Sequence, residues 1–200
     1  MLAGRKHWVF DLDGTLTLAV HDFDALRREL GLPSGLPILE ALQNRPEEEV
    51  GVLMRRLDAL EADLVSATGP APGAADLLRG LSEQCCKMGV LTRNSLENAR
   101  ATLVHCGLSH RFDPADVLGR AEASPKPSPD GILQLLRRWG ASPRDAVMIG
   151  DFRYDLEAGR AAGVATVSVD ASGQHEWASL ADVCVDTLSE LLSLANDENR

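Results

Sequence analysis

From about residue 73 onward, short apolar runs alternate with helical patterns, and this alternation limits the possible folds more than any other feature of the sequence. The apolar runs are residues 88–92, 146–150, 164–169 and a last one at "DVCV". Residues 95–107 and 128–140 have the polar starts and glycine ends that are typical of helices. Strands that alternate with helices predict an α/β fold, with a Rossmann-like parallel sheet core that helices cover on both faces.

Residues 18–72 lack this alternation. Two stretches there are helical in pattern, and the second has apolar residues in heptad-like spacing at Val50, Leu53, Leu57, Leu60 and Leu64. A Pro/Gly-rich hinge at residues 68–73 leads back to the α/β pattern. We therefore predict a small all-helical domain, residues 18–72, inserted after the first strand of a core formed by residues 1–17 and 73–200. The apolar stripe is expected to pack within the insert, with a dimer seam as the alternative.

The composition limits the partners. The formal net charge is -10, which argues against nucleic acid or an anionic membrane surface as a ligand. The sequence offers no apolar stretch long enough for a signal peptide or a membrane span. Its four cysteines form no Cys-x-x-Cys pair, so we expect reduced thiols rather than a zinc site or a disulfide framework. These features predict a soluble cytoplasmic protein.

The stretch "HWVFDLDGTLT", residues 7–17, ends an apolar run with Asp11 and Asp13. Ligands of parallel α/β sheets bind at the carboxyl ends of the strands, and both aspartates are expected to point to one side there. Two such carboxylates repel each other unless a cation lies between them, and Mg²⁺ suits a site with few carboxylates. A plain Asp-Gly turn is the alternative. A calcium-binding loop is disfavoured, because Asp13 itself precedes Gly14 and residues 18–20 are apolar.

Other predicted strand ends carry polar residues too. Thr92 ends one strand and is followed by Arg93 and Asn94 at a helix start, where a hydroxyl and free backbone N–H groups can hold a phosphate. Lys126 lies between two prolines in "SPKPSPD", which restricts its backbone. A helix cap and a solvated loop lysine are the respective alternatives.

The run at 146–150 is followed by Asp151, a possible third metal ligand, and by Asp155 one helical turn later. The sequence leaves three possible roles open for Asp155. It can bind a metal-bound water, orient Lys126, or interact with the helix start, where negative charge is favourable.

Together these residues resemble the four motifs of the haloacid dehalogenase (HAD) superfamily of phosphatases. The motifs are "DLDGTLT" (Asp11 to Thr17), "LTRN" (Leu91 to Asn94), "PKPSPD" (Pro125 to Asp130) and "GDFRYD" (Gly150 to Asp155). The resemblance covers the whole core, and the helical insert is similar to the small cap of phosphoglycolate-phosphatase-like members. Any one motif is modest evidence, but the four occur in order and each at a predicted strand end.

The resemblance implies a mechanism for the matching positions. Asp11 would be the nucleophile that forms an aspartyl-phosphate, and Asp13 would protonate the leaving oxygen and then take a proton from water. Mg²⁺ would be held by Asp11, the backbone carbonyl of Asp13, and Asp151. The phosphate-binding positions would be Gly14, Thr92, Arg93 and Lys126, with Asn94 and Asp155 in secondary roles.

Several related chemistries remain to be weighed. Dehalogenase relatives lack the second aspartate, so Asp13 argues against them. Phosphonate cleavage in this family uses a lysine from the cap, and residues 18–72 contain none. A phosphomutase acting on a sugar phosphate uses the same core and stays open as an alternative. A non-catalytic phosphate-binding module is the less favoured one.

The substrate is expected to be a small phosphorylated metabolite, phosphoglycolate or a similar ester, since a small cap closes over small molecules. Two residues of the insert are tentative substrate contacts, His21 after the first motif and Arg45 in "LQNRPEEE", although a solvated or structural role is favoured for both. We expect a monomer or a homodimer.

Overall fold

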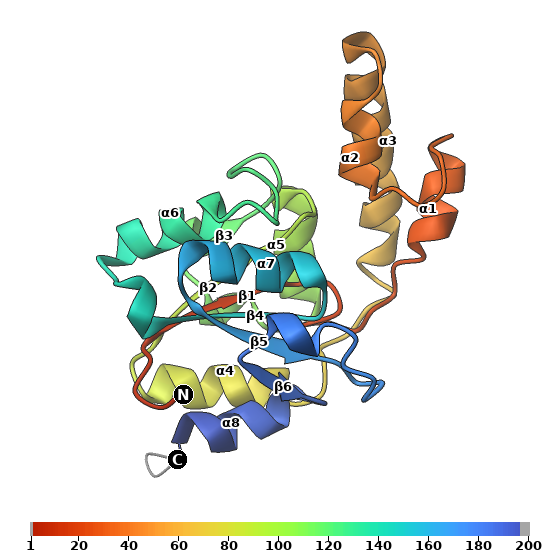
Figure 1. Ribbon diagram of the computed structural model, residues 1–200. Helices are drawn as coiled ribbons and strands as arrows, with labels where there is room; N and C mark the ends of the chain where they lie inside the picture. The colour runs from red at the N-terminus through yellow and green to blue at the C-terminus, as the bar shows by residue number, and fades with distance from the viewer. Residues whose placement is uncertain (1, 197–200) are drawn as a thin grey trace.

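The structure is a computed structural model that describes residues 2–196 of the chain. Six strands form one sheet in the order β3-β2-β1-β4-β5-β6, and each neighbouring pair is parallel (Figure 1). The strands are β1 (His7–Phe10), β2 (Lys87–Leu91), β3 (Val117–Leu118), β4 (Ala146–Gly150), β5 (Ala165–Val169) and β6 (Val183–Val185). This parallel sheet confirms the predicted α/β core.

Helices cover both faces of the sheet (Figure 1). The core helices are α4 (Ala74–Glu83), α5 (Leu96–His105), α6 (Asp130–Trp139), α7 (Arg153–Ala162) and α8 (Leu188–Asn196). Side chains alternate along a strand, so Trp8 and Phe10 of β1 pack in the hydrophobic cluster of α4, α5 and α8, whereas Val9 packs with α6 and α7. Trp8, Val9 and Phe10 are therefore buried between the two layers of helices, and Asp11 is the first polar residue that follows them.

The segment after β1 is helical, as predicted, and Figure 1 shows it projecting from one end of the core. It contains α1 (Phe23–Glu29), α2 (Ile38–Gln43) and α3 (Glu47–Leu64), which we call the helical cap. The cap has a hydrophobic cluster of its own, built around Leu26, Leu42 and Leu57. Leu53 and Leu60 pack against it, so these members of the apolar stripe contact the rest of the cap. The exact domain bounds, 1–17 with 73–200 and 18–72, stay a prediction.

Element boundaries differ from the expectations by small amounts. β4 is the predicted strand 146–150, but β2 ends at Leu91, so that Thr92 is the first residue beyond it. The α6 helix begins at Asp130, and the hydroxyl of Ser128 accepts a hydrogen bond from its backbone N–H over 3.3 Å. Ser95 is the N-cap of α5, since its side chain accepts a hydrogen bond from the backbone N–H of Asn98.

Helices α2 and α4 and strand β3 were not predicted from the sequence. Helix α2 ends at Gln43, inside the stretch "LQNRPEEE" of residues 42–49. Strand β3 has two residues and gives no readable pattern. In the part of the chain that the structure describes, every helix is too short or too polar to cross a membrane.

Candidate active site

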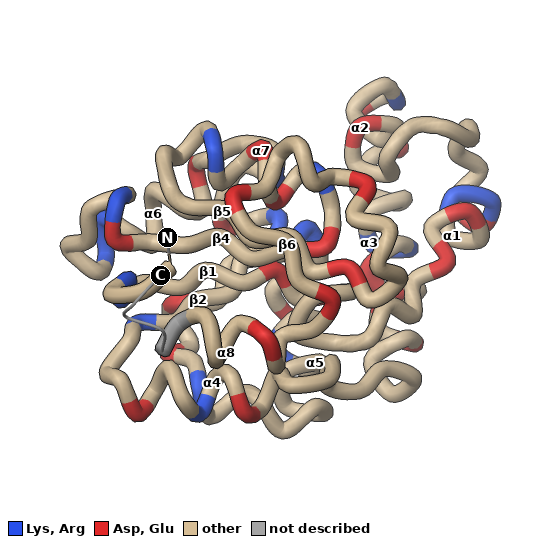
Figure 2. Tube along the Cα trace, turned by 60° about the horizontal axis from the view of Figure 1, so that its bottom comes forward, with Lys and Arg blue, Asp and Glu red and all other residues tan. Residues whose placement is uncertain are grey.

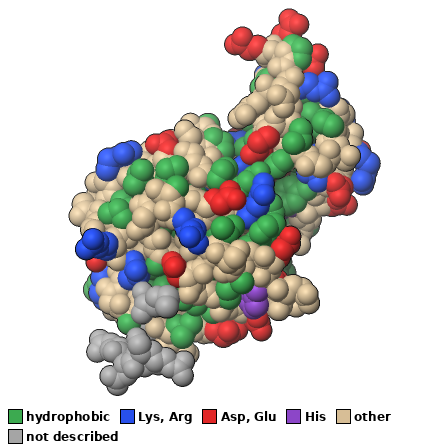
Figure 3. Space-filling view, viewed as in Figure 1, with side chains coloured by type: hydrophobic (Ala, Val, Ile, Leu, Met, Phe, Trp, Pro, Cys, Tyr) green, Lys and Arg blue, Asp and Glu red, His purple; other side chains and the backbone are tan. Residues whose placement is uncertain are grey.

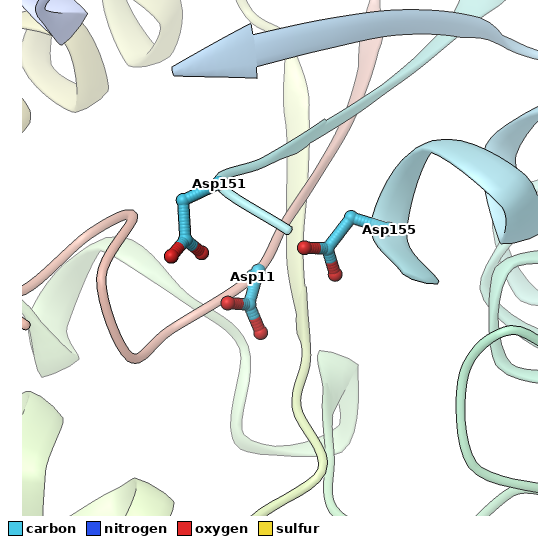
Figure 4. A group of neighbouring side chains, drawn as sticks. All are labelled: Asp11, Asp151 and Asp155. Atoms are coloured by element: carbon cyan, nitrogen blue, oxygen red, sulfur yellow. The ribbon is translucent and has the colours of Figure 1, made fainter. Parts of the chain in front are cut away.

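Three carboxylates meet where β1 and β4 end. Asp11 follows β1, and its backbone N–H donates to the carbonyl oxygen of Ile149 over 2.9 Å. Asp151 follows β4, the neighbour of β1, and Asp155 lies in the first turn of α7. Oxygens of the three side chains all lie within 4.8 Å of one another, and Figure 4 shows them converging. The shared edge of adjacent parallel strands therefore places them in one small space.

Lys126 lies between two of these carboxylates. Its side chain is 2% exposed, and its Nζ is 2.5 Å from Asp11 Oδ1 and 2.6 Å from Asp155 Oδ1. Burial by itself lowers the pKa of Lys126, but Asp11 and Asp155 outweigh burial and hold the pKa above its usual range. The ammonium therefore stays charged. Asp155 also accepts a hydrogen bond from the backbone N–H of Phe152, at the start of α7, over 3.1 Å. Asp155 therefore both orients Lys126 and pairs a backbone N–H group at the helix N-terminus.

Negative charge remains in excess around this lysine. Burial raises the pKa of Asp151 to about 8, and the neighbouring Asp11 and Asp155 add to the effect. Burial likewise raises the pKa of Asp155 to about 6, although Lys126 lowers it. Buried carboxylates this close together cannot all be ionised without a cation between them. A hard divalent cation, which prefers oxygen ligands, can supply that charge. The donor set of Asp11, Asp151 and Asp155 fits such a cation; the side chain of Asp13 is not part of this group.

Gly14 allows the close approach of Asp151. Its φ is +91°, and a Cβ atom at this position would lie 2.5 Å from Asp151 Oδ2. The backbone N–H of Gly14 donates to the carbonyl oxygen of Thr17, and the hydroxyl of Thr15 donates to Asp151 Oδ1 over 3.0 Å. Gly14 therefore contributes space for a carboxylate, while its N–H is used within the turn.

Asp13 faces the end of β2 instead. The Thr92 hydroxyl lies 3.4 Å and the Asn94 amide nitrogen 3.3 Å from Asp13 Oδ2, each placed to donate a hydrogen bond. His21 Nδ1 is 3.9 Å from Asp13 Oδ1. Burial raises the pKa of Asp13, while His21 lowers it. The protonated form of this carboxyl is thus favoured relative to an exposed aspartate.

The side chain of Arg93 turns toward the cap. Its Nη2 donates to Glu40 Oε2 of α2 over 2.6 Å, and Nη1 donates to the carbonyl oxygen of Lys126. The guanidinium also lies over the ring of Tyr154, 4.8 Å from the centroid. The charge of Arg93 is therefore already matched, and the residue joins core and cap.

A cavity of about 410 Å³ lies between the core and the helical cap. The predicted site residues that line it are Asp11, Asp13, His21, Thr92, Arg93, Asn94, Lys126, Asp151 and Asp155. Arg45 does not line it. Its guanidinium donates to the carbonyl oxygen of Gly31 over 2.6 Å and lies 3.9 Å from Glu49, beside a separate surface hollow. The structure thus gives no support to Arg45 as a substrate contact.

Glu61 and Arg120 line the same cavity and were not predicted. Arg120 follows β3 in the core and pairs with Glu61 and Asp58 of α3. No motif surrounds either residue, so the sequence carries no signal for this pair. Figure 2 shows acidic and basic positions interleaved in the region where the sheet meets the cap.

Comparisons with known proteins show which family and which fold this chain matches. A family model of haloacid dehalogenase-like hydrolases matches residues 24–169. An uncharacterized hydrolase of Saccharomyces cerevisiae is 32% identical over 100% of this chain and 96% of its own length. A phosphoglycolate phosphatase of Pseudomonas putida is 30% identical over 84% of this chain and 70% of its own length. The crystal structure of a hydrolase from Pseudomonas syringae has the same fold, with a TM-score of 0.77, 23% identity, and coverage of 94% of this chain and 96% of that one.

Proposed function

The chain belongs to the haloacid dehalogenase-like hydrolases, and from this premise we propose that it is a Mg²⁺-dependent phosphatase for a small organic phosphate monoester. One observation carries the proposal. The carboxylate of Asp11 lies at the end of β1 with Lys126 on one side and two further carboxylates within 4.8 Å, beside a cavity that can hold a small ester. A carboxylate can attack an anionic phosphoryl group only where positive charge is gathered around both.

Asp11 is the proposed nucleophile. Its free carboxylate oxygen forms a bond to phosphorus while the bond between phosphorus and the ester oxygen breaks, which gives an aspartyl-phosphate. Lys126 supports this step, since its ammonium stays charged and can contact both Asp11 and a phosphoryl oxygen. Asp11, the backbone carbonyl of Asp13 and Asp151 would hold Mg²⁺, with Asp155 near enough to bind it directly or through water, and the bound ion would neutralise the transferred phosphate.

Asp13 is the proposed general acid and base. Burial raises its pKa, which favours the protonated form needed to give a proton to the departing alcohol oxygen. Asp13 then takes a proton from the water that attacks phosphorus, the bond between phosphorus and Asp11 breaks, and inorganic phosphate leaves. Thr92 and Asn94 hold Asp13 in place from the end of β2.

The proposal extends to substrate and setting in general terms. The named relative from Pseudomonas putida is a phosphoglycolate phosphatase, so phosphoglycolate belongs on the first substrate panel. The cysteines of the described part are free thiols and the formal net charge is -10, which support a cytoplasmic location and a substrate other than nucleic acid. The protein is also proposed to be a monomer or a homodimer.

Phosphate release from a panel of small phosphate esters, with and without Mg²⁺, tests the proposal. We expect Mg²⁺-dependent release in the wild type and none in Asp11→Asn, which should fold normally. Asp13→Asn should slow alkyl phosphates far more than activated aryl phosphates, because aryl leaving groups need no proton. Mg²⁺-dependent turnover by Asp11→Asn would disprove the nucleophile assignment. Isomer conversion of a sugar phosphate without phosphate release would identify a mutase.

A further inference from the structure

The cavity is lined by apolar side chains as well as by the proposed catalytic residues. The apolar residues that line it, which we call the apolar wall, are Phe23, Leu36, Pro37, Ile38, Leu39, Leu57, Phe152 and Tyr154. Three of them are unusually open to solvent for their type: Phe23 is 53%, Leu36 44% and Phe152 43% exposed. Figure 3 shows hydrophobic side chains on the surface between the core and the base of the cap. Large apolar side chains that stay exposed inside a concave site mark a ligand contact.

This wall is built from both sides of the cavity. Phe23 lies on α1 and stacks on His21, with 5.6 Å between ring centroids. Phe152 precedes α7 and makes edge contacts with Tyr154 and Trp177, at 5.2 Å and 5.6 Å between centroids. Each ring is held by an aromatic neighbour, so the wall is preorganised. An organic group that enters between core and cap meets these rings next to the reacting phosphate.

Positive charge in the cavity is already matched by carboxylates. Among the described residues that line it, Lys126 pairs with Asp11 and Asp155, and the three arginines pair with acidic side chains. The arginine pairs are Arg27 with Asp24, Arg93 with Glu40, and Arg120 with Asp58 and Glu61. Lys126 and the proposed metal ion would bind the phosphate of a substrate. A second anionic group would displace one of these carboxylates or remain unpaired in a largely apolar space.

On these two observations we propose that the preferred substrate is the phosphate monoester of an uncharged, apolar alcohol, rather than an ester with a second anionic group. The inference rests on the proposed phosphatase function and narrows its substrate class. The overall reaction is hydrolysis: the ester and water give the apolar alcohol and inorganic phosphate. Phosphoglycolate, whose organic part carries a carboxylate, is then a poor substrate of this chain.

The test compares phosphate monoesters of primary alcohols. Their leaving groups have similar reactivity, so differences in rate report on how the organic group binds. We expect kcat/KM for 2-phenylethyl phosphate to exceed that for phosphoglycolate at least about tenfold, with glycerol phosphate in between. Phosphoglycolate as the best substrate would overturn the inference and leave the phosphatase proposal intact. Failure of all esters in the wild type, with the same result in Asp11→Asn, would overturn the phosphatase proposal itself.

Variants test the wall and the charge balance separately. Phe152→Ala and Phe23→Ala should each raise KM for 2-phenylethyl phosphate several-fold, and by a larger factor than KM for glycerol phosphate. Val104→Ala, which removes another exposed apolar side chain, on α5, is the matched control and should change neither. Glu40→Gln frees Arg93 from its partner and should increase kcat/KM for phosphoglycolate. Equal KM values in the two phenylalanine variants and the wild type would contradict the apolar site.

Discussion

Arg120 Nη2 donates to Glu61 Oε2 over 2.8 Å and thereby joins the segment after β3 to helix α3 of the cap. Both side chains are largely buried, and Arg120 contacts Asp58 as well. Burial raises the pKa of Glu61 to about 7, although the Arg120 guanidinium lowers it. The Arg120 charge persists at every ordinary pH, so protonation of Glu61 is what changes this contact between cap and core.

Replacing Glu61 with Gln should remove a pH dependence of stability. The folded-state pKa of about 7 lies above the usual 4.5, so the stability linked to this group is full below pH 4.5 and is lost as the pH rises through 7. The wild type should lose up to roughly 3 kcal/mol over this window, and Glu61→Gln should not. Thermal unfolding of both proteins at pH 5, 6, 7 and 8 measures the difference. Glu29→Gln, at an exposed glutamate, is the control, and parallel curves for Glu61→Gln and wild type would contradict the raised pKa.

Replacing Lys126 with Met should destabilise the metal-free protein by roughly 3–5 kcal/mol at pH 7.5, because two buried carboxylates lose their cation. The loss should shrink at pH 5.5, where Asp155, whose pKa burial raises to about 6, can take up a proton instead. Urea unfolding at the two pH values measures both effects. Lys87→Met, at an exposed lysine on β2, should cost little. A Lys126→Met protein as stable as the wild type would show that the lysine is not needed to neutralise these carboxylates.

The positions of several site residues were predictable because each follows a readable apolar run. Asp11, Thr92 and Asp151 come directly after β1, β2 and β4, and parallel strands bring their carboxyl ends to one edge. Lys126 could be singled out by its two flanking prolines. The local sequence pattern and the geometry of a parallel sheet were therefore enough to predict that these residues lie close together.

The contacts between core and cap were not predictable in the same way. Glu61 and Arg120 are 59 residues apart, and Glu40 and Arg93 are 53 apart. Such pairs depend on how the cap lies against the core, and no periodicity in either segment encodes that orientation. The same reason explains Arg45, whose place in the insert gave no indication that its side chain would contact Gly31 instead of the cavity.

Replacing Asp151 with Asn should separate metal binding from stability. The variant keeps an oxygen that can accept the Thr15 hydrogen bond, but it removes one of three crowded carboxylates. Without metal it should be as stable as the wild type or more stable by about 1 kcal/mol. The increase in melting temperature on adding Mg²⁺ should nearly disappear, because a ligand stabilises only the fold that binds it. Asp145→Asn, at an exposed aspartate, should retain the full Mg²⁺ shift. An undiminished shift in Asp151→Asn would exclude Asp151 as a ligand.

Replacing Gly14 with Ala should impair metal binding through Asp151. The new Cβ would lie 2.5 Å from Asp151 Oδ2, so the carboxylate must move, and the φ of +91° adds backbone strain of about 1–2 kcal/mol. Gly107→Ala is the matched control, because Gly107 also has a positive φ, +69°, and its added Cβ would meet nothing within 4 Å. Calorimetric titration with Mg²⁺ should show affinity reduced about tenfold or more in Gly14→Ala only. Equal affinity in both variants would mean that the strain of the turn, rather than the contact with Asp151, explains why glycine occupies this position.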